Sequence, residues 1–423
     1  MKHCIYSGSS IGESLSIEII NNSSHKQRGF DAVKRILLVN ESFKIGGIES
    51  AFVNLANELQ KHCEVDVLVF NPRGAMRAQL HPGVHVLIPS WRMQAIGVSM
   101  NEALHSGDFR VLAAHTLAGF WVKLADNALP IQWMLSNERR LTGYDLAIAF
   151  RQEERKHIVC SGFSRYVDQC VEARVKAAWL HFDPASIDLD STFNLPFYRR
   201  LDKVVCVSHS LMERFVSLYP DMREKADYCY NAIDRDNLLT MGAQAQAVPY
   251  PEGKTICFSA CRLAEEKALV RGIRAMTPTF QAHPEVMWYI AGDGPEKADI
   301  QNAIRAVGLE DRIILLGQQP NPYPYMRSAD LLINVSTHEA APMVFMEAHV
   351  LGVPVFATRT SSADELLRDG ETDFICENSE EGIRESFARL MDDPERLMQA
   401  KRRLEAAPCT CEDSVLKLLS WMA

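Results

Sequence analysis

The stretch between residues 330 and 355 constrains the fold most, because two apolar runs are joined there by a short loop and a helical pattern. The run 331–336 is predicted as a buried strand, residues from about 342 to 351 as a helix, and the residues after it as the next strand. Pro342 suits the first turn of a helix, where its missing N–H is not needed, and Gly352 suits the position just past the helix end. The helix N-terminus then lies at the carboxyl end of a strand, where open α/β sheets bind anionic ligands.

Short apolar runs alternate with helical patterns along most of the chain, in two successive series. The first series has predicted strands at 35–39, 65–70, 84–87, 145–150, 177–182 and 203–208, and is closed by 227–233. The second has predicted strands at 255–260, 286–291, 312–317, 331–336, 353–358 and 374–377. Such runs are typical of parallel strands that are buried on both faces. The sequence therefore predicts an α/β protein with two Rossmann-like, doubly wound domains that face each other across a cleft.

Composition suggests where these domains begin and end. Residues 1–30 are rich in Ser and Asn and lack periodicity, which is typical of a weakly ordered leader. A linker is predicted where Gln, Ala and Pro accumulate before the second series. The predicted organisation is a leader (1–30), a first domain (31–233), a linker (234–252), a second domain (253–407) and a C-terminal tail or helix (408–423). Within the first domain, residues 89–140 give no clear pattern.

The 423 residues carry a formal net charge of −9, which is unevenly distributed. Residues 31–230 hold 23 Lys and Arg against 23 Asp and Glu, whereas the residues from 231 onward hold 19 against 29. Neither half has the basic character of a nucleic-acid-binding protein. No apolar run approaches the roughly 18 to 20 residues that cross a bilayer, and the first residues lack the apolar core of a secretion signal. We therefore expect a cytoplasmic protein.

Four charged residues of the second series stand close after predicted strands. Glu339 falls in the loop of the opening stretch and Glu347 in its helix, while Arg262 and Lys267 follow the first strand of the series. Carboxylates at such a place can accept hydrogen bonds from sugar hydroxyls. Two cations can clamp a diphosphate and stabilise it as a leaving group. Solvated loop and helix residues without a ligand are the alternative interpretation of both pairs.

Three residues of the first series also follow predicted strands. Gly46 and Gly47 lie in the loop after the first strand, where glycine lets the backbone approach a ligand closely. Their spacing is not that of the Gly-x-Gly-x-x-Gly dinucleotide fingerprint. His181 lies near the end of the run 177–182, and a purely structural histidine is the alternative there.

Two short matches to metal-binding patterns are weak. Asp188-Leu-Asp190 is a three-residue pattern that arises readily by chance, and Cys409-Thr-Cys411 lacks a second pair or clustered histidines. The eleven cysteines are odd in number and sit mostly in apolar runs, as reduced core thiols do. No metal site is predicted.

In their order and spacing, these motifs together resemble glycosyltransferase family 4, a group of nucleotide-sugar-dependent enzymes with the GT-B fold. The resemblance covers about residues 33–400. It rests on Gly46-Gly47, Val207-Ser208, Tyr230-Asn231, Arg262 with Glu266-Lys267, Ala291-Gly-Asp-Gly294, Leu316-Gly317 and Glu339 with Glu347. The segments Asn321-Pro-Tyr-Pro-Tyr325 with Ala329-Asp330, and Ala178-Trp-Leu-His181, look most like members that build bacterial capsular or exopolysaccharides.

The resemblance implies a role for each matched residue of the second domain. Arg262 and Lys267 would bind the donor diphosphate, and the helix that starts at Met343 and Val344 would contribute its N-terminus. Glu347 would hold the nucleotide ribose.

For the sugar and the facing domain, the resemblance implies further contacts. Glu339 would touch the donor sugar or its departing phosphate. Gly46 and Gly47 would line the cleft from the first domain, and His181 would lie near the transferred sugar.

The implied function is retaining transfer of a sugar, of the hexosyltransferase type, from a nucleotide-diphosphate sugar to a glycan or lipid-linked acceptor in polysaccharide or capsule biosynthesis. No protein nucleophile is evident, so front-face attack is expected, with the leaving phosphate taking the acceptor proton. Cations and a helix N-terminus would replace a metal, and no cofactor is expected. A lipid-linked acceptor would bring the protein to the inner face of the membrane. A sugar-nucleotide isomerase (epimerase) of the same fold and a noncatalytic partner subunit are the alternatives.

Two residues depart from the family pattern. Ala340 follows the first glutamate and Ala268 follows Lys267, where the family usually has glycine. Alanine would be strained if either position needed a positive φ, so we expect either a different local backbone or a weaker hold on the donor.

Overall fold

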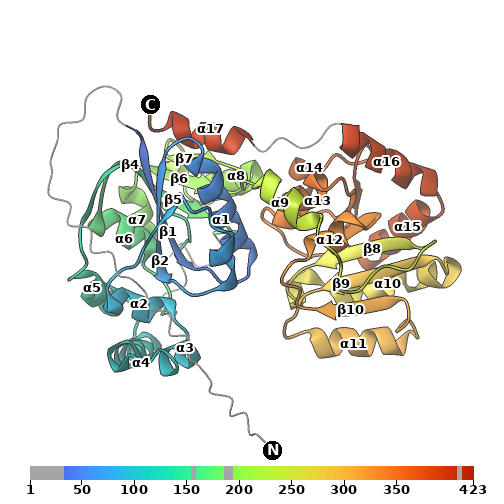
Figure 1. Ribbon diagram of the computed structural model, residues 1–423, viewed down its shortest axis with the longest axis horizontal. Helices are drawn as coiled ribbons and strands as arrows, with labels where there is room; N and C mark the ends of the chain where they lie inside the picture. Colours follow the sequence, from blue (N-terminus) through green and yellow to red (C-terminus); the bar gives the residue numbers. More distant parts are fainter. Residues whose placement is uncertain (1–32, 154–158, 185–193, 407–411) are drawn as a thin grey trace, which may run out of the picture. The chain divides into compact units, whose positions relative to one another are not determined.

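The computed structural model describes residues 33–153, 159–184, 194–406 and 412–423. It contains two parallel β-sheets, one of seven and one of six strands, and helices follow most of the strands (Figure 1). The predicted α/β class with two Rossmann-like domains is thereby confirmed. The predicted leader, Asp188-Leu-Asp190 and Cys409-Thr-Cys411 lie outside the described residues.

The seven-stranded sheet has the order β3-β2-β1-β4-β5-β6-β7, and its strands pair in parallel. Its strands are β1 (Arg35–Ser42), β2 (Glu64–Asn71), β3 (His85–Leu87), β4 (Leu141–Ala149), β5 (Val171–Leu180), β6 (Lys203–Cys206) and β7 (Ala226–Tyr228). The chain builds outward from β1 to β3 and then returns to place β4 on the other side of β1. The carboxyl ends of β1 and β4 therefore border a topological switch point, where doubly wound sheets bind ligands.

The six-stranded sheet repeats this plan with the order β10-β9-β8-β11-β12-β13. Its strands are β8 (Thr255–Ala260), β9 (Val286–Ala291), β10 (Ile313–Gly317), β11 (Leu331–Asn334), β12 (Val355–Thr358) and β13 (Phe374–Cys376). Here the switch point lies between β8 and β11. The segments that follow these two strands are thus brought together by topology.

Strand bounds agree with the prediction where apolar residues run without interruption. β8 and β9 have the bounds that their apolar runs predict. β5 begins at Val171, well before the predicted residue 177. The prediction missed its first half because charged residues alternate there with apolar ones. Glu172 and Arg174 there are exposed, so this half of the strand is buried on one face only.

The helices of the first series include four that fill the stretch 89–140. The helices are α1 (Gly47–Gln60), α2 (Trp91–Gly97), α3 (Met100–Leu104), α4 (Phe109–Leu124), α5 (Ala128–Leu135), α6 (Phe163–Cys170), α7 (Leu195–Arg200) and α8 (His209–Leu218), with 3₁₀ turns η1 (Ala75–Gln79) and η2 (Pro220–Met222). α4 escaped prediction because it is apolar on both its buried and its exposed side, which removes the period that marks an amphipathic helix.

The first of the remaining helices, α9, lies inside the segment predicted as a linker. They are α9 (Arg235–Gly242), α10 (Leu269–Ala282), α11 (Lys297–Ala306), α12 (Tyr323–Arg327), α13 (Met343–Val350), α14 (Ala363–Leu366), α15 (Glu380–Met391), α16 (Pro394–Ala406) and α17 (Glu412–Ser420), with the 3₁₀ turn η3 (Glu265–Lys267). α9 contacts α12 and α13, and α17 returns to β7, where Lys417 Nζ lies 2.5 Å from Asp227 Oδ1. Within the described residues, no helix is both long and apolar enough to cross a bilayer.

Candidate functional site

The switch point of the six-stranded sheet brings a lysine and a glutamate together. Lys267 ends η3, after β8, and Glu339 lies in the loop after β11. Lys267 Nζ donates to Glu339 Oε1 over 2.6 Å, and Asn334 Nδ2 and Ser336 Oγ donate to the same oxygen over 3.2 and 2.7 Å. No hydrogen bond to Glu339 Oε2 is found within the described residues. The second carboxylate oxygen is therefore available to a ligand.

Backbone contacts hold these two segments in register. Thr337 N donates to Glu266 O over 2.8 Å, which ties the loop after β11 to η3. Ser361 Oγ donates to the carbonyl oxygen of Glu339 over 2.9 Å, and Asn378 Nδ2 donates to Thr337 O over 3.0 Å. The loop is thus anchored from three sides, which preorganises the Lys267–Glu339 pair.

A small pocket opens beside Lys267. Its lining combines polar strand ends with apolar side chains, namely Ser259, Ala260, Cys261, Lys267, Leu269, Ile333, Asn334, Val335, Ser336 and Val344. Lys267 and Glu339 keep 20% and 10% of their side chains exposed, so both are largely desolvated yet reachable. A cation in such a place binds anionic oxygens more strongly than it would in bulk water.

Helix α13 directs its N-terminus toward the same edge of the sheet. Pro342 occupies its N-cap with φ −67°, and Met343 and Val344 are its first two helical residues. The first N–H groups of a helix have no partner within the helix and carry partial positive charge. Because Val344 also lines the pocket, this helix end can receive anionic oxygens next to Lys267.

The two alanines that depart from the family pattern differ in conformation. Ala268 has φ 49° and ψ 33°, and it alone has a positive φ among the described non-glycine residues. It therefore carries the strain that alanine was expected to meet, at a cost of about 1–2 kcal/mol. Ala340 has no positive φ, so the local backbone there does not require glycine.

Glu347 lies on α13 but faces inward. Its Oε1 accepts a hydrogen bond from the Tyr323 hydroxyl over 3.0 Å, and the residue is 8% exposed. Burial raises the pKa of this carboxyl to about 7, although the hydrogen bond from Tyr323 lowers this pKa in part. The pKa of Tyr323 is also raised, mainly by burial, while a hydrogen bond with Ser50 of α1 lowers it. Sequence patterns gave no sign of Tyr323 as the partner of Glu347.

Arg262 and Lys267 contact different carboxylates. Its guanidinium donates to Glu266 Oε1 over 2.8 Å, and 69% of its side chain is exposed. It is not among the residues that line the pocket beside Lys267. The two cations that the sequence pairs are therefore not joined in one cluster in this structure.

The predicted glycine loop forms the start of α1, at the switch point of the seven-stranded sheet. Gly46 is the N-cap, with extended backbone (φ −177°), and Gly47 is the first helical residue. A Cβ at Gly47 would meet no atom within 4 Å, so open space lies beside it. The first turn carries Glu49, which forms an ion pair with Arg151 at 3.5 Å. Burial raises the pKa of the Glu49 carboxyl.

His181 follows β5 and is buried. Its Nε2 lies 2.8 Å from Phe150 O, and Gln152 Oε1 accepts from its backbone N over 2.7 Å. The ring also packs against Phe150 and Trp179, with centroid separations of 4.8 and 6.4 Å. Burial lowers the pKa of the imidazole to about 3. The side chain is thus held as a neutral ring that donates to a carbonyl oxygen.

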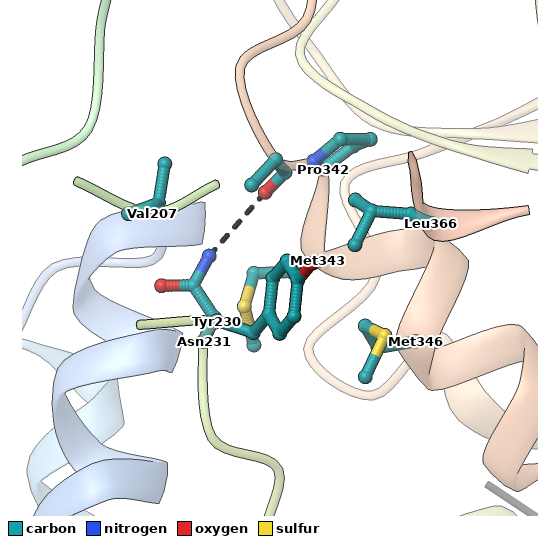
Figure 2. A pocket seen from close by; sticks show the side chains of 8 residues that line it. Val207, Tyr230, Asn231, Pro342, Met343, Met346 and Leu366 are labelled. Atoms are coloured by element: carbon teal, nitrogen blue, oxygen red, sulfur yellow. Dashed lines mark hydrogen bonds between the residues drawn. The ribbon is translucent and has the colours of Figure 1, made fainter. Parts of the chain in front are cut away.

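A second small pocket adjoins the start of α13 (Figure 2). Met343 and Met346 form part of its apolar wall, together with Val207, Tyr230 and Leu366 (Figure 2). Asn231 Nδ2 donates to Ala341 O over 3.3 Å, while its Oδ1 is buried without a hydrogen-bond partner within the described residues. Val207, Tyr230 and Asn231 belong to motifs that the sequence analysis identified. Those motifs did not predict that these residues lie next to α13.

No group of three or more His, Cys, Asp or Glu that could hold a metal ion is found within the described residues. The expectation of metal-independent chemistry remains a prediction. Asn334 and Ser336 were included in a predicted strand, and the sequence did not identify them as hydrogen-bond donors to Glu339. Their position as polar residues at the end of an apolar run was the available signal.

Comparison with known proteins matches residues 242–406 to the family model "Glycosyl transferases group 1". N-acetyl-alpha-D-glucosaminyl L-malate synthase of Bacillus anthracis is 27% identical over 207 residues, which cover 46% of this chain and 51% of that protein. The lipopolysaccharide core biosynthesis glycosyltransferase LpsD of Rhizobium meliloti is 26% identical over 358 residues, covering 82% of this chain and 86% of that protein. The chain spans about half the length of several of the curated relatives it matches.

Among solved structures, HepE of Anabaena in complex with UDP and glucose aligns with a TM-score of 0.64 at 19% identity, covering 92% of this chain and 99% of that one. The matched segment 242–406 contains the switch point that holds Lys267, Glu339 and the start of α13. Residues 242–406 are therefore similar to the glycosyl transferases group 1 family, and the chain has the GT-B fold.

Proposed function

We propose that this chain is a retaining glycosyltransferase that moves a sugar from a nucleoside diphosphate sugar to a glycan or lipid-linked acceptor in polysaccharide biosynthesis. The observation that carries the proposal is the meeting of Lys267, Glu339 and the start of α13 at one switch point. The relative LpsD is named for lipopolysaccharide core biosynthesis, and the solved HepE structure contains UDP and glucose. Both support a nucleotide-sugar donor and a polysaccharide product.

In this proposal, the donor diphosphate lies between Lys267 and the first N–H groups of α13. An ammonium group and a helix N-terminus both favour phosphate oxygens, and the pocket beside them is partly closed to water. Arg262 is exposed and turns from Glu266 to the diphosphate when the donor binds. Glu347, eight residues after Glu339, accepts hydrogen bonds from the ribose hydroxyls.

Glu339 acts on the sugar. Its Oε1 is occupied by Lys267, Asn334 and Ser336, so its Oε2 accepts a hydrogen bond from a sugar hydroxyl. This arrangement fixes the sugar relative to the phosphate that leaves. Gly46 and Gly47 line the ligand site from the other switch point, where open space lies beside Gly47 and the Glu49 carboxylate lies beside Gly46. His181 supports the nearby loop as a neutral ring.

The proposed chemistry breaks the bond between C1 of the sugar and the phosphate oxygen and forms a bond from C1 to the acceptor oxygen on the same face. The acceptor hydroxyl proton passes to the departing phosphate oxygen. Lys267 and the α13 N-terminus stabilise the negative charge that develops on that phosphate. Their positive charge stands where a metal ion stands in other transferases, so activity is expected to persist in EDTA.

The test is calorimetry of the purified chain against UDP-, GDP- and ADP-sugars, with Lys267→Met as the variant. One of these donors is expected to bind, and Lys267→Met is expected to weaken binding at least about tenfold, since a charge-assisted hydrogen bond contributes roughly 1.5–3 kcal/mol. Lys254→Met is the matched control, because Lys254 precedes β8 at the opposite end of that strand and its ammonium donates to Pro284 O. Equal affinity of the two variants, or no donor bound, contradicts the proposal.

Incubation of the donor without acceptor separates the isomerase alternative. A transferase leaves the sugar configuration of the donor unchanged, whereas an isomerase converts it, as NMR of the sugar would show. Product made with acceptor is then examined for its anomeric configuration, and an inverted product contradicts the retaining mechanism.

A further inference from the structure

The segment 321–325, Asn-Pro-Tyr-Pro-Tyr, is a motif of the sequence to which the proposed function gives no role. It follows β10 and begins helix α12. Pro322 is the N-cap of that helix, and Pro324 lies in its first turn, where the missing N–H of proline costs no hydrogen bond. The fixed φ of each proline also restricts the backbone on either side of Tyr323. The course of the chain at Tyr323 is therefore set by its two neighbours.

Hydrogen bonds fasten this segment to α9 and to the chain that follows α9. Asn321 Nδ2 donates to Met241 O over 2.9 Å and to Gln244 Oε1 over 3.0 Å. Asn321 Oδ1 accepts from the backbone N of Tyr323 over 3.2 Å. Three further hydrogen bonds join residues 246–250 to the segment: Gln246 Nε2 to Pro324 O, Val248 N to the Tyr325 hydroxyl, and the Tyr250 hydroxyl to Tyr325 O. The segment is thus held in place before any ligand binds.

This anchored segment presents one hydroxyl group to Glu347. Tyr323 Oη donates to Glu347 Oε1 over 3.0 Å. Within the described residues, Oε2 of the same carboxyl accepts no hydrogen bond, and Glu347 keeps 8% of its surface exposed. One oxygen of the carboxyl is therefore held by the protein, and the other is left to a ligand. Glu339 is divided in the same way, with its Oε1 held by Lys267.

No charged neighbour favours the ionised form of Glu347 within the described part of the chain. Burial raises the pKa of its carboxyl to about 7, and the hydrogen bond from Tyr323 lowers this pKa in part. The charged residues of the adjoining helices, Arg235 and Asp236 of α9 and Arg327 of α12, do not shift this pKa, and β12 carries no titratable side chain. The Tyr323 hydroxyl is therefore the group that favours the carboxylate.

We propose that Tyr323 is a positioning residue of the donor site, whose hydroxyl holds Glu347 by Oε1 as a carboxylate so that Oε2 accepts from a hydroxyl of the nucleotide ribose. This inference rests on the proposed function, in which Glu347 binds the ribose. An ionised carboxylate is a stronger acceptor for a hydroxyl group than a protonated carboxyl is. Donor affinity is therefore expected to increase as the pH rises through the pKa of this carboxyl, about 7.

The test compares the wild-type chain with Tyr323→Phe by calorimetry between about pH 6 and 9. The probe is the UDP-, GDP- or ADP-sugar that the wild-type chain binds, because both phosphates of a sugar nucleotide are diesters whose charge stays constant over this range. In Tyr323→Phe the midpoint of the affinity profile is expected to move up by at least about one pH unit, since a hydrogen bond to a charged group is lost. Affinity near pH 7 then falls at least about fivefold, and the difference narrows toward pH 9.

A second measurement follows Glu347 without a donor. Carbon NMR of carboxyl-labelled glutamate titrates the free protein, and the Glu347 signal is the one that Glu347→Gln lacks. Its midpoint is expected to move up in Tyr323→Phe by the same amount as the affinity profile. Tyr289→Phe serves as the control, because Tyr289 is a buried tyrosine of the same sheet whose hydroxyl lies 4.0 Å from Met287 Sδ. It should keep both wild-type profiles.

Thermal unfolding verifies that each variant is folded under the conditions of both measurements. The proposal requires both shifts, so the absence of either in Tyr323→Phe overturns it while donor binding by the wild-type chain leaves the proposed function intact. A loss of affinity by one factor at every pH also overturns it, because a structural defect alone would cause that. If the wild-type chain binds no sugar nucleotide, the proposed function fails and the ribose role of Tyr323 fails with it, even where the carboxyl titration shifts.

Discussion

Lys267 Nζ and Glu339 Oε1 lie 2.6 Å apart and join the segments that follow two adjacent strands, β8 and β11. The pair is 72 residues apart in sequence, yet it is fixed by the reversal of strand order at this point. Because Asn334 and Ser336 donate to the same oxygen, the carboxylate is oriented from several directions. The pair therefore links the architecture of the sheet to the proposed donor site.

Glu339→Gln tests the charge of this carboxylate. The amide oxygen can still accept from Ser336 and Asn334, so stability is expected to fall by only about 1 kcal/mol. The kcat/KM is expected to fall about tenfold to a hundredfold, because a charged acceptor at the sugar and the ion pair that orients Lys267 are both lost. Steady-state kinetics measures this. Glu310→Gln, an exposed residue before β10, should leave kcat/KM unchanged.

Ala268→Gly tests the strained backbone after Lys267. Glycine adopts φ 49° without the Cβ penalty of about 1–2 kcal/mol but loses more entropy on folding, by about 0.5–1 kcal/mol. The net expectation is a gain of about 0.5–1 kcal/mol, seen as a Tm raised by about 1–3 °C in calorimetry. Ala303→Gly in helix α11 makes the same change where φ is helical and should lower the Tm. A lower Tm for Ala268→Gly would contradict the inference that Ala268 is strained.

Glu347→Gln tests the buried carboxyl whose pKa is raised to about 7. Between the ordinary pKa of 4.5 and about 7, the folded protein holds a proton that the unfolded chain releases. The stability that this group contributes is therefore present below pH 4.5 and is lost as the pH rises through 7. Above pH 7 the variant should be more stable than wild type by about 1–3 kcal/mol. The difference should shrink toward pH 4.5.

Urea unfolding of both proteins at several pH values measures this prediction. The Gln oxygen can still accept from Tyr323, so the hydrogen bond is retained and the charge alone is removed. A difference in stability that does not change with pH would show that Glu347 stays ionised in the folded protein.

His181 is expected to stay neutral across the working pH range. Burial lowers its pKa from 6.5 to about 3, so the unfolded chain binds more protons between these values and stability falls as the pH drops through that window. NMR of labelled imidazoles should show an Nε2–H tautomer that does not titrate between pH 5 and 8, with exposed His62 as the reference signal. Titration of His181 near 6.5 would contradict the buried geometry.

The sequence by itself determined the strands, the two-domain α/β class and the placement of Glu339, Lys267 and the α13 start near strand ends. These depend on local patterns: continuous apolar runs, Pro342 at a helix start and Gly352 after its end. Such signals are short-range, because burial of a strand on both faces and the conformational limits of Pro and Gly are properties of a few neighbouring residues.

Only the tertiary structure decided which of these residues meet. Strand order brought Lys267 to Glu339 but left Arg262 bound to Glu266 at the surface. It buried Glu347 against Tyr323 and placed an apolar helix, α4, outside the first layer. These outcomes depend on contacts between segments far apart in the chain, and the pairing of sheets and helices that makes them leaves no local trace in the sequence.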